Sequence, residues 1–188
     1  MKSILMVFVL FVSLAFMPKG EQATGSDTNE NGKRKPVILN AGFEEEGETG
    51  FRDNWLNKSL GGPIQITNGP IFEGVKAGKL PDEGDRIAYQ LVRVEPNTDY
   101  AISFYYLLRS EPAGSLTVSI LNGDVQSKAQ VEGGTISTLK LSNEDYDKRY
   151  RPASIQFNSG DNDAIGLFLT NEGVDARFDS FKIEETVE

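Results

Sequence analysis

The chain has 188 residues, of which 38% are hydrophobic and 25% charged, an ordinary balance for a soluble globular protein with one domain. It contains neither cysteine nor histidine, so disulfides, thiolate or imidazole metal ligands and the commonest general base at neutral pH are excluded. The formal net charge of −9 disfavours nucleic acids and anionic glycans as partners, and leaves neutral sugars and cations such as calcium.

Residues 1–15 have the pattern of a signal peptide. Lys2 precedes the apolar run Ile4–Phe16, which is shorter than the about 20 residues that span a bilayer. The small residues Ser13 and Ala15 predict cleavage after Ala15. A buried N-terminal strand or helix is the alternative. We therefore expect a protein secreted to the periplasm or the extracellular medium, without membrane insertion.

Residues 16–36 are predicted to form a flexible polar tether. The stretch Glu21–Lys35 has no aromatic or branched aliphatic residue and consists mostly of Gly, Asn, Ser, Thr and charged residues. Such a segment cannot bury enough apolar area to offset the entropy lost on ordering. Residues 37–188 are left to form a single domain.

That domain has a hydrophobic period of two, which is typical of β-strands. The alternating segments are Arg86–Val94, Tyr100–Leu108, Ser115–Leu121, Thr135–Leu141, Ala153–Phe157, Ala164–Thr170 and Arg177–Ile183. Turn residues separate them, for example Pro96-Asn97, Gly133-Gly134 and Ser159-Gly160-Asp161. A helical turn is plausible only at Ser142–Tyr150, where a loop is equally plausible. The fold class expected is all-β, an antiparallel β-sandwich of jelly-roll type.

Several motifs occur in a familiar order. They are Asn-x-Gly-Phe-Glu at 40–44, Trp55 after Gly50, Gly-x-x-Ala-Gly at 74–78, Pro-x-Thr-x-Tyr-x-Ile-Ser-Phe at 96–104 and Phe-Asp at 178–179. In these segments the chain resembles the jelly-roll carbohydrate-binding modules of families four, nine and twenty-two, which share the galactose-binding-like sandwich. Two departures are Asp179-Ser180, where the family usually has Asp-Asp, and Tyr146 in place of a late Trp.

The resemblance implies a structural calcium ion that joins the two ends of the domain. Its ligands would be the carboxylates of Glu44 and Asp179, with backbone carbonyls near Gly42 and Lys79. Calcium takes hard oxygen ligands of this mixed kind. The alternative is that Glu44–Glu46 form a solvated acidic turn, which is the usual fate of a charge run.

The resemblance also implies a noncatalytic, monomeric module that binds a neutral polysaccharide or oligosaccharide. If Phe104 faces the core, Tyr105 faces outward, and the alternation predicts that Arg86 and Gln90 join it on a concave sheet. Aromatic residues in or near loops are predicted as cleft walls: Trp55, Tyr89, Tyr146 and Tyr150. For each aromatic, packing in the core is an alternative.

Two other function classes stay open. A small jelly-roll enzyme, such as a lyase or a glycosidase, is the less favoured, because no catalytic signature is visible and a lyase's anionic substrate would meet an acidic protein. An extracellular β-sandwich that binds protein or serves as surface structure is the other, because one fold hosts many functions.

Overall fold

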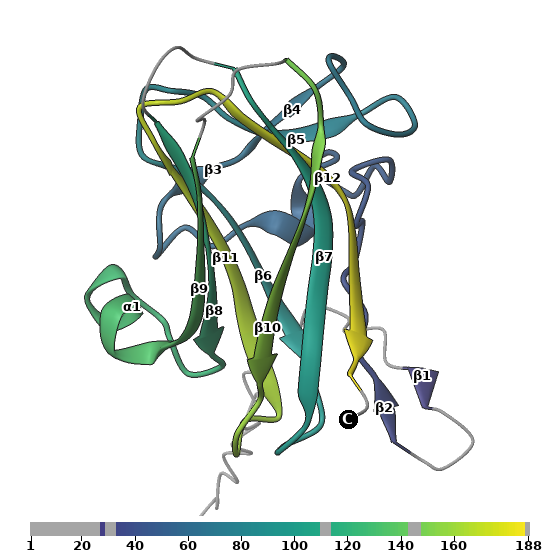
Figure 1. Ribbon diagram of the computed structural model, residues 1–188, viewed down its shortest axis with the longest axis vertical. Coiled ribbons are helices and arrows are strands. Elements are labelled where there is room, and N and C mark those ends of the chain that lie inside the picture. The colour runs from purple at the N-terminus through teal and green to yellow at the C-terminus, as the bar shows by residue number, and fades with distance from the viewer. Residues whose placement is uncertain (1–26, 29–32, 110–113, 143–147, 187–188) are drawn as a thin grey trace, which may run out of the picture.

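The computed structural model describes residues 27–28, 33–109, 114–142 and 148–186 (Figure 1). The predicted signal peptide and Tyr146 lie outside the described residues, and within those residues no helix is long and apolar enough to cross a membrane. The short elements are β1 (Asp27–Thr28), β2 (Arg34–Lys35), the 3-10 helix η1 (Asp53–Trp55), β3 (Gly62–Pro63), β4 (Gln65–Thr67) and β5 (Ala77–Leu80). The longer elements are β6 (Arg86–Arg93), β7 (Asp99–Leu108), β8 (Ser115–Asn122), α1 (Lys128–Gly134), β9 (Thr135–Ser142), β10 (Arg151–Asn158), β11 (Ala164–Glu172) and β12 (Ala176–Glu185).

Two five-stranded sheets pack face to face. Sheet I has the strand order β10-β7-β12-β5-β4, and sheet II has the order β3-β6-β11-β8-β9. Neighbouring strands are antiparallel throughout, except that β3 pairs with β6 in parallel. The predicted antiparallel β-sandwich is therefore confirmed.

All seven predicted alternating segments form strands, β6 to β12. The turns between them use residues that tolerate a left-handed backbone: φ is +52° at Asn97, +54° at Gly160 and +62° at Gly173. The helix α1 was not predicted. It ends at Gly134 and so contains Gly133-Gly134, which were expected to form a turn; a helix of seven residues is too short for a helical period to show.

The main core lies between the sheets and is closed at one end by aromatic rings. Phe43 packs 5.1 Å from Trp55 and 5.8 Å from Phe178, measured between ring centroids. Phe181 lies 5.0 Å from both Trp55 and Phe104. All five rings are buried. The chain segment after β2 and the last strand are thus joined through their aromatic side chains.

A second, smaller hydrophobic cluster covers the outer face of sheet II. Its buried members are Leu60, Ile87, Tyr89, Leu121, Val125 and Phe168. Leu60 and Val125 belong to loops, so this face of the sheet is packed against chain segments instead of facing solvent. The outer face of sheet II therefore offers little open sheet surface along β6.

Candidate functional site

An aromatic cluster stands on the outer face of sheet I. The loop 68–76, here called the covering loop, joins β4 to β5 and folds over this face. Its Phe72 stacks on Tyr105 of β7, with ring centroids 3.5 Å apart and planes inclined by 12°. Tyr150 lies 5.8 Å from Phe72 and donates a hydrogen bond of 3.0 Å to the carbonyl oxygen of Pro70. Phe72, Tyr105 and Tyr150 form what we call the aromatic cluster.

The alternation along β7 determines where Tyr105 points. Tyr100, Ile102 and Phe104 are buried in the core, so Tyr105 projects from the opposite face, as the sequence predicts. Its neighbours across the sheet are Pro152 of β10 and Asp179 of β12. Tyr105 is therefore the one predicted sugar-contacting residue that the structure places on an outward-facing sheet surface within its described part.

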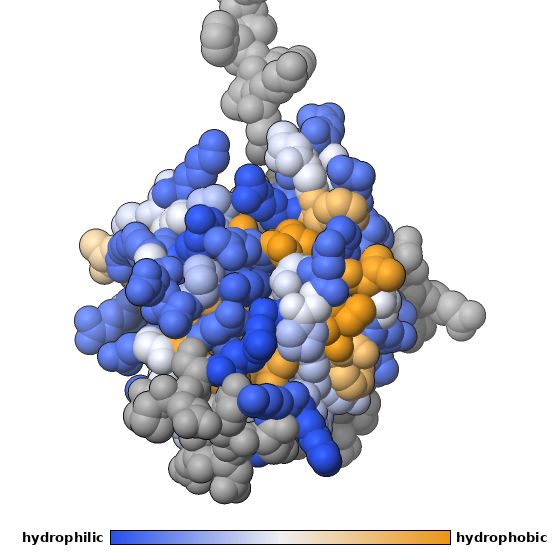
Figure 2. All heavy atoms as spheres, turned by 90° about the horizontal axis from the view of Figure 1, so that it is seen from above, coloured by the Kyte–Doolittle hydropathy of each residue, from blue (hydrophilic) through white to orange (hydrophobic). Residues whose placement is uncertain are grey.

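Apolar surface is exposed at this end of the molecule. Phe72 keeps 41% of its surface exposed and Val75 keeps 63%, both in the covering loop. Figure 2 views this end and shows hydrophobic residues gathered on one side, while most of the remaining surface is hydrophilic.

The hydroxyl of Tyr150 in the aromatic cluster stays protonated. Burial is the main cause that raises the pKa of this hydroxyl, and the charge of Asp179 adds to the rise, so the hydroxyl stays a hydrogen-bond donor.

Polar side chains continue along the same face, next to small residues of β7. Ser103 is flanked by Ser154 of β10 and Lys182 of β12. Ala101 is flanked in the same way by Gln156 and Glu184. These four flanking side chains are exposed, and Lys182 lies 2.6 Å from Glu184. The surface thus combines exposed aromatic rings with hydrogen-bonding groups.

Beside the aromatic cluster, Glu44 and Asp179 hold the backbone of the covering loop. Asp179 Oδ2 accepts hydrogen bonds from the N–H groups of Phe72 (3.1 Å) and Glu73 (3.2 Å). Glu44 Oε1 accepts from the N–H groups of Val75 (2.8 Å) and Lys76 (2.9 Å). We call this arrangement the carboxylate clasp. The structure thus brings together the two carboxylates that the resemblance pairs.

A tight turn positions Glu44. Asn40 has a φ of +45°. Its side-chain amide donates hydrogen bonds to the carbonyls of Glu45 and Phe51, and its side-chain oxygen accepts one from the N–H of Glu45. Phe43, with a φ of +62°, then points into the core while Glu44 points out toward the covering loop. Glu44, Glu45 and Glu46 are all exposed, as a solvated turn would have them, but Glu44 also accepts hydrogen bonds from the covering loop.

The carboxylate of Asp179 is buried among backbone N–H groups. Its side chain is fully buried, and burial raises the pKa of its carboxyl; the charge of Glu44 adds to the rise, while the N–H groups of Glu73, Phe72 and Ser180 oppose it. In the described part of the chain, no ion pair involves either carboxylate. Nor do those residues hold a cluster of three or more acidic side chains that could bind a metal, so a cation here would also need carbonyl or water oxygens.

Of the two carbonyl positions predicted for calcium, Gly42 lies close to the clasp and Lys79 does not. A side-chain carbon placed on Gly42 would be 3.8 Å from Asp179 Oδ1. Lys79 pairs with Arg177 in the sheet, two residues before Asp179, and its ammonium lies 3.0 Å from Asp175. Lys79 is therefore a diagonal neighbour of Asp179 in the β5–β12 ladder and does not face it directly.

The prediction that Arg86 and Gln90 share a face with Tyr105 is wrong. On β6 it is Ala88 and Val92 that enter the main core, so residues of even number face inward. Gln90 is buried there and bonds to both backbone groups of Leu39 and to the carbonyl of Asn54. Arg86 donates to the carbonyl of Pro63 at 2.7 Å. Both side chains fix neighbouring segments on sheet II.

Trp55 and Tyr89 are not available as cleft walls either. Trp55 is fully buried, and its indole N–H donates to the carbonyl of Asn40 at 3.1 Å. Tyr89 is 94% covered and its ring lies against Gly166, where an added side-chain carbon would come within 2.8 Å of it. Burial also raises the pKa of the Tyr89 hydroxyl. The core alternative is thus the correct one for both residues.

Sequence reasoning missed Phe72, although a weak signal was present. It is an aromatic residue in the stretch Asn68–Val75, which is rich in Gly and Pro and predicts a loop. An aromatic side chain in such a loop has no strand period that would place it in the core. The partner strand, however, could not be known from the sequence.

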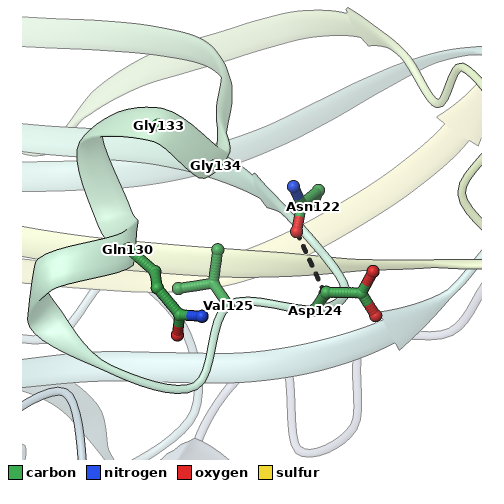
Figure 3. A pocket seen from close by; sticks show the side chains of 6 residues that line it. All are labelled: Asn122, Asp124, Val125, Gln130, Gly133 and Gly134. Atoms are coloured by element: carbon green, nitrogen blue, oxygen red, sulfur yellow. Dashed lines mark hydrogen bonds between the residues drawn. The ribbon is translucent and has the colours of Figure 1, made fainter.

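A small hollow lies beside α1, away from the aromatic cluster. It has a volume of about 270 Å³ and is lined by Asn122, Asp124, Val125, Gln130, Gly133 and Gly134. Figure 3 shows the side chain of Gln130 projecting from α1 beside Val125, and Asn122 accepting a hydrogen bond from the N–H of Asp124. The lining has no aromatic ring, and the side-chain oxygens of Asn122 and Gln130 accept hydrogen bonds from the backbone of Asp124 and Gln126. It offers less to a ligand than the aromatic cluster.

Comparison with known proteins gives the fold a family context. No family profile and no curated protein sequence matches the chain. Among solved structures, the CBM22-1 xylan-binding domain of Xyn10C from Paenibacillus barcinonensis is 16% identical, covers 79% of this chain and 93% of its own, and has a TM-score of 0.52. TmCBM61, solved with β-1,4-galactotriose, is 14% identical over 81% of this chain and 99% of its own, with a TM-score of 0.56.

A third similar structure is a family 4 carbohydrate-binding module, 14% identical over 80% of this chain and 100% of its own, with a TM-score of 0.51. Identities this low establish the fold and nothing finer. The chain therefore has the jelly-roll β-sandwich fold of the solved carbohydrate-binding modules.

Proposed function

We propose that the protein is a secreted, noncatalytic carbohydrate-binding module that binds a neutral polysaccharide or oligosaccharide on the outer face of sheet I. The observation that carries the proposal is the half-exposed Phe72, stacked on Tyr105 beside a row of polar side chains. A flat apolar ring packs against the C–H face of a sugar, and polar neighbours bond to its hydroxyls. The net charge of −9 favours an uncharged ligand.

Titration calorimetry with soluble xylan and with β-1,4-galactotriose tests this proposal. We expect binding to at least one of them, and we expect Phe72→Ala to weaken it about three- to tenfold, or about 0.7 to 1.4 kcal/mol, because the stacking ring is lost. Ile136→Ala is the matched control, since Ile136 is 36% exposed but lies on β9 of sheet II. If neither these ligands nor a glycan array of neutral polysaccharides gives binding, the proposal fails.

We also propose that Glu44 and Asp179 hold a structural calcium ion. Three findings support it: the two carboxylates converge from opposite ends of the domain, Asp179 is fully buried, and the pKa of Asp179 is raised, mainly by burial and in smaller part by the charge of Glu44. A divalent cation would relieve this repulsion. The remaining ligands would be carbonyl or water oxygens.

Thermal unfolding with calcium and with chelator tests the calcium proposal. At about 100 times the dissociation constant, binding adds about 2.7 kcal/mol, so we expect Tm to rise by about 5 to 11 °C. Glu44→Ala and Asp179→Ala should abolish the rise. Glu46→Ala, which removes the same charge from an exposed neighbour, should keep it. An unchanged Tm in the parent protein would refute the site.

A further inference from the structure

We infer that Glu44 and Asp179 are positioning residues for the ligand surface, because their oxygens hold the covering loop so that Phe72 lies over Tyr105. The inference rests on the proposed function, since it makes the clasp act on sugar binding through Phe72. It requires no metal ion: the hydrogen bonds run directly from the backbone N–H groups to the two carboxylates.

The clasp holds the loop on both sides of Gly74. Asp179 accepts hydrogen bonds from the N–H groups of Phe72 and Glu73, and Glu44 accepts them from the N–H groups of Val75 and Lys76. Hydrogen bonds to a charged acceptor are about twice as strong as neutral ones. The backbone on either side of the bend is therefore fixed, and the N–H of Phe72 is itself one of the four held groups.

Asp179 is itself held in place beside Tyr105. The two residues are direct partners in the β12–β7 ladder, so the carboxylate that holds Phe72 neighbours the ring on which Phe72 stacks. Ser180 donates its N–H to Asp179 Oδ1 at 2.7 Å, at a bulge where Ser180 has a φ of +53°. Asp179, whose own position is fixed by the sheet, thus fixes the position of Phe72.

Gly74 shows that the loop is shaped around the Glu44 carboxylate. Its φ is +67°, and a side-chain carbon added there would lie only 2.3 Å from Glu44 Oε1. Only glycine combines this backbone conformation with such a close approach.

The first half of the covering loop has separate anchors. Arg177 donates to the carbonyl of Gly69, and Tyr150 donates to that of Pro70. Lys76 reaches back to the side chain of Asn68 at 3.0 Å. Loss of Glu44 should therefore release Val75 and Lys76 and leave Phe72 and Glu73 held by Asp179 alone, without unfolding the loop at its base.

The test uses the full mature chain in the presence of chelator, so that no metal contributes. Glu44→Ala removes both hydrogen bonds, whereas Glu44→Gln keeps an oxygen where Oε1 accepts them. We expect the NMR contact between the Phe72 and Tyr105 rings to weaken in Glu44→Ala, where Asp179 alone still holds the N–H of Phe72, and to recover in Glu44→Gln. Amide exchange of Val75 and Lys76 should accelerate at least tenfold in Glu44→Ala. Glu46→Ala should behave like the parent protein.

Sugar affinity supplies the second readout, again with soluble xylan and β-1,4-galactotriose. Glu44→Ala should weaken binding, but by no more than Phe72→Ala, because Asp179 still holds the N–H of Phe72. The double variant should be no weaker than Phe72→Ala alone, because both changes act through the same ring. Additive losses, or a ring contact in Glu44→Ala as strong as in the parent protein, would overturn the positioning role. If Phe72→Ala binds sugar normally, the proposed function fails. The NMR contact between the Phe72 and Tyr105 rings tests the positioning role of the clasp independently of sugar binding.

Discussion

Trp55→Ala is expected to lower the free energy of unfolding by about 3 to 5 kcal/mol, the usual cost of truncating a large buried aromatic residue. Trp55 is fully buried between Phe43 and Phe181, at centroid distances of 5.1 and 5.0 Å. Its removal opens a cavity at the end of the core where the early segment and β12 meet. Denaturant unfolding, followed by circular dichroism, measures the change.

Trp55→Phe separates packing from any role in binding. It keeps an aromatic ring in the core but removes the indole donor of the Asn40 carbonyl, which still accepts from the N–H of Phe43, so the lost hydrogen bond costs about 0.5 to 1.5 kcal/mol. Because the Trp55 ring has no exposed surface, the affinity of the folded variant for sugar should equal that of the parent protein. A selective loss of binding in a stable Trp55→Phe variant would contradict the assignment of this residue to the core.

The sequence predicts correctly which side chains of β7 point into the core, but not which side chains of β6 do so. Both outcomes have one physical reason. On β7 the inward residues are large and apolar and the outward ones include Ala101 and Ser103, so the alternation is unambiguous. On β6 both faces are packed, because loops and α1 cover the outside of sheet II. Ile87 and Tyr89 look like core residues and are buried, but in the second cluster. Periodicity identifies a strand; it does not say which of two buried faces lies inside.

The candidate site was predictable only in part. The motif resemblance paired Glu44 with Asp179 across the chain, and the structure brings their carboxylates to one loop. The donors to those carboxylates are backbone N–H groups of residues 72–76, which every sequence carries and no motif marks. The stacking of Phe72 on Tyr105 likewise depends on how the covering loop folds back, a long-range contact that local patterns do not encode.

Gly78→Ala is the second substitution with a large expected effect, and it links the core to the site. A side-chain carbon on Gly78 would lie 2.4 Å from Phe178 Cε2 and 2.7 Å from Phe43 Cζ. Both rings are fully buried and packed against each other at 5.8 Å, so neither has free space to enter. Overpacking of this kind costs about 1 to 3 kcal/mol, or roughly 2 to 12 °C in Tm for a domain of this size.

Gly133→Ala is the matched control, because Gly133 lies within α1 and an added carbon there meets nothing within 4 Å. Alanine is the better helix former by about 0.8 to 1 kcal/mol, so this variant should be as stable as the parent protein or more stable. Phe43 and Phe178 directly precede Glu44 and Asp179, so rings pushed apart by Gly78→Ala should also displace the clasp. We therefore expect faster amide exchange at Phe72 to Lys76 in Gly78→Ala and unchanged exchange in Gly133→Ala. A destabilised Gly78→Ala with an intact clasp would show that core and clasp are independent.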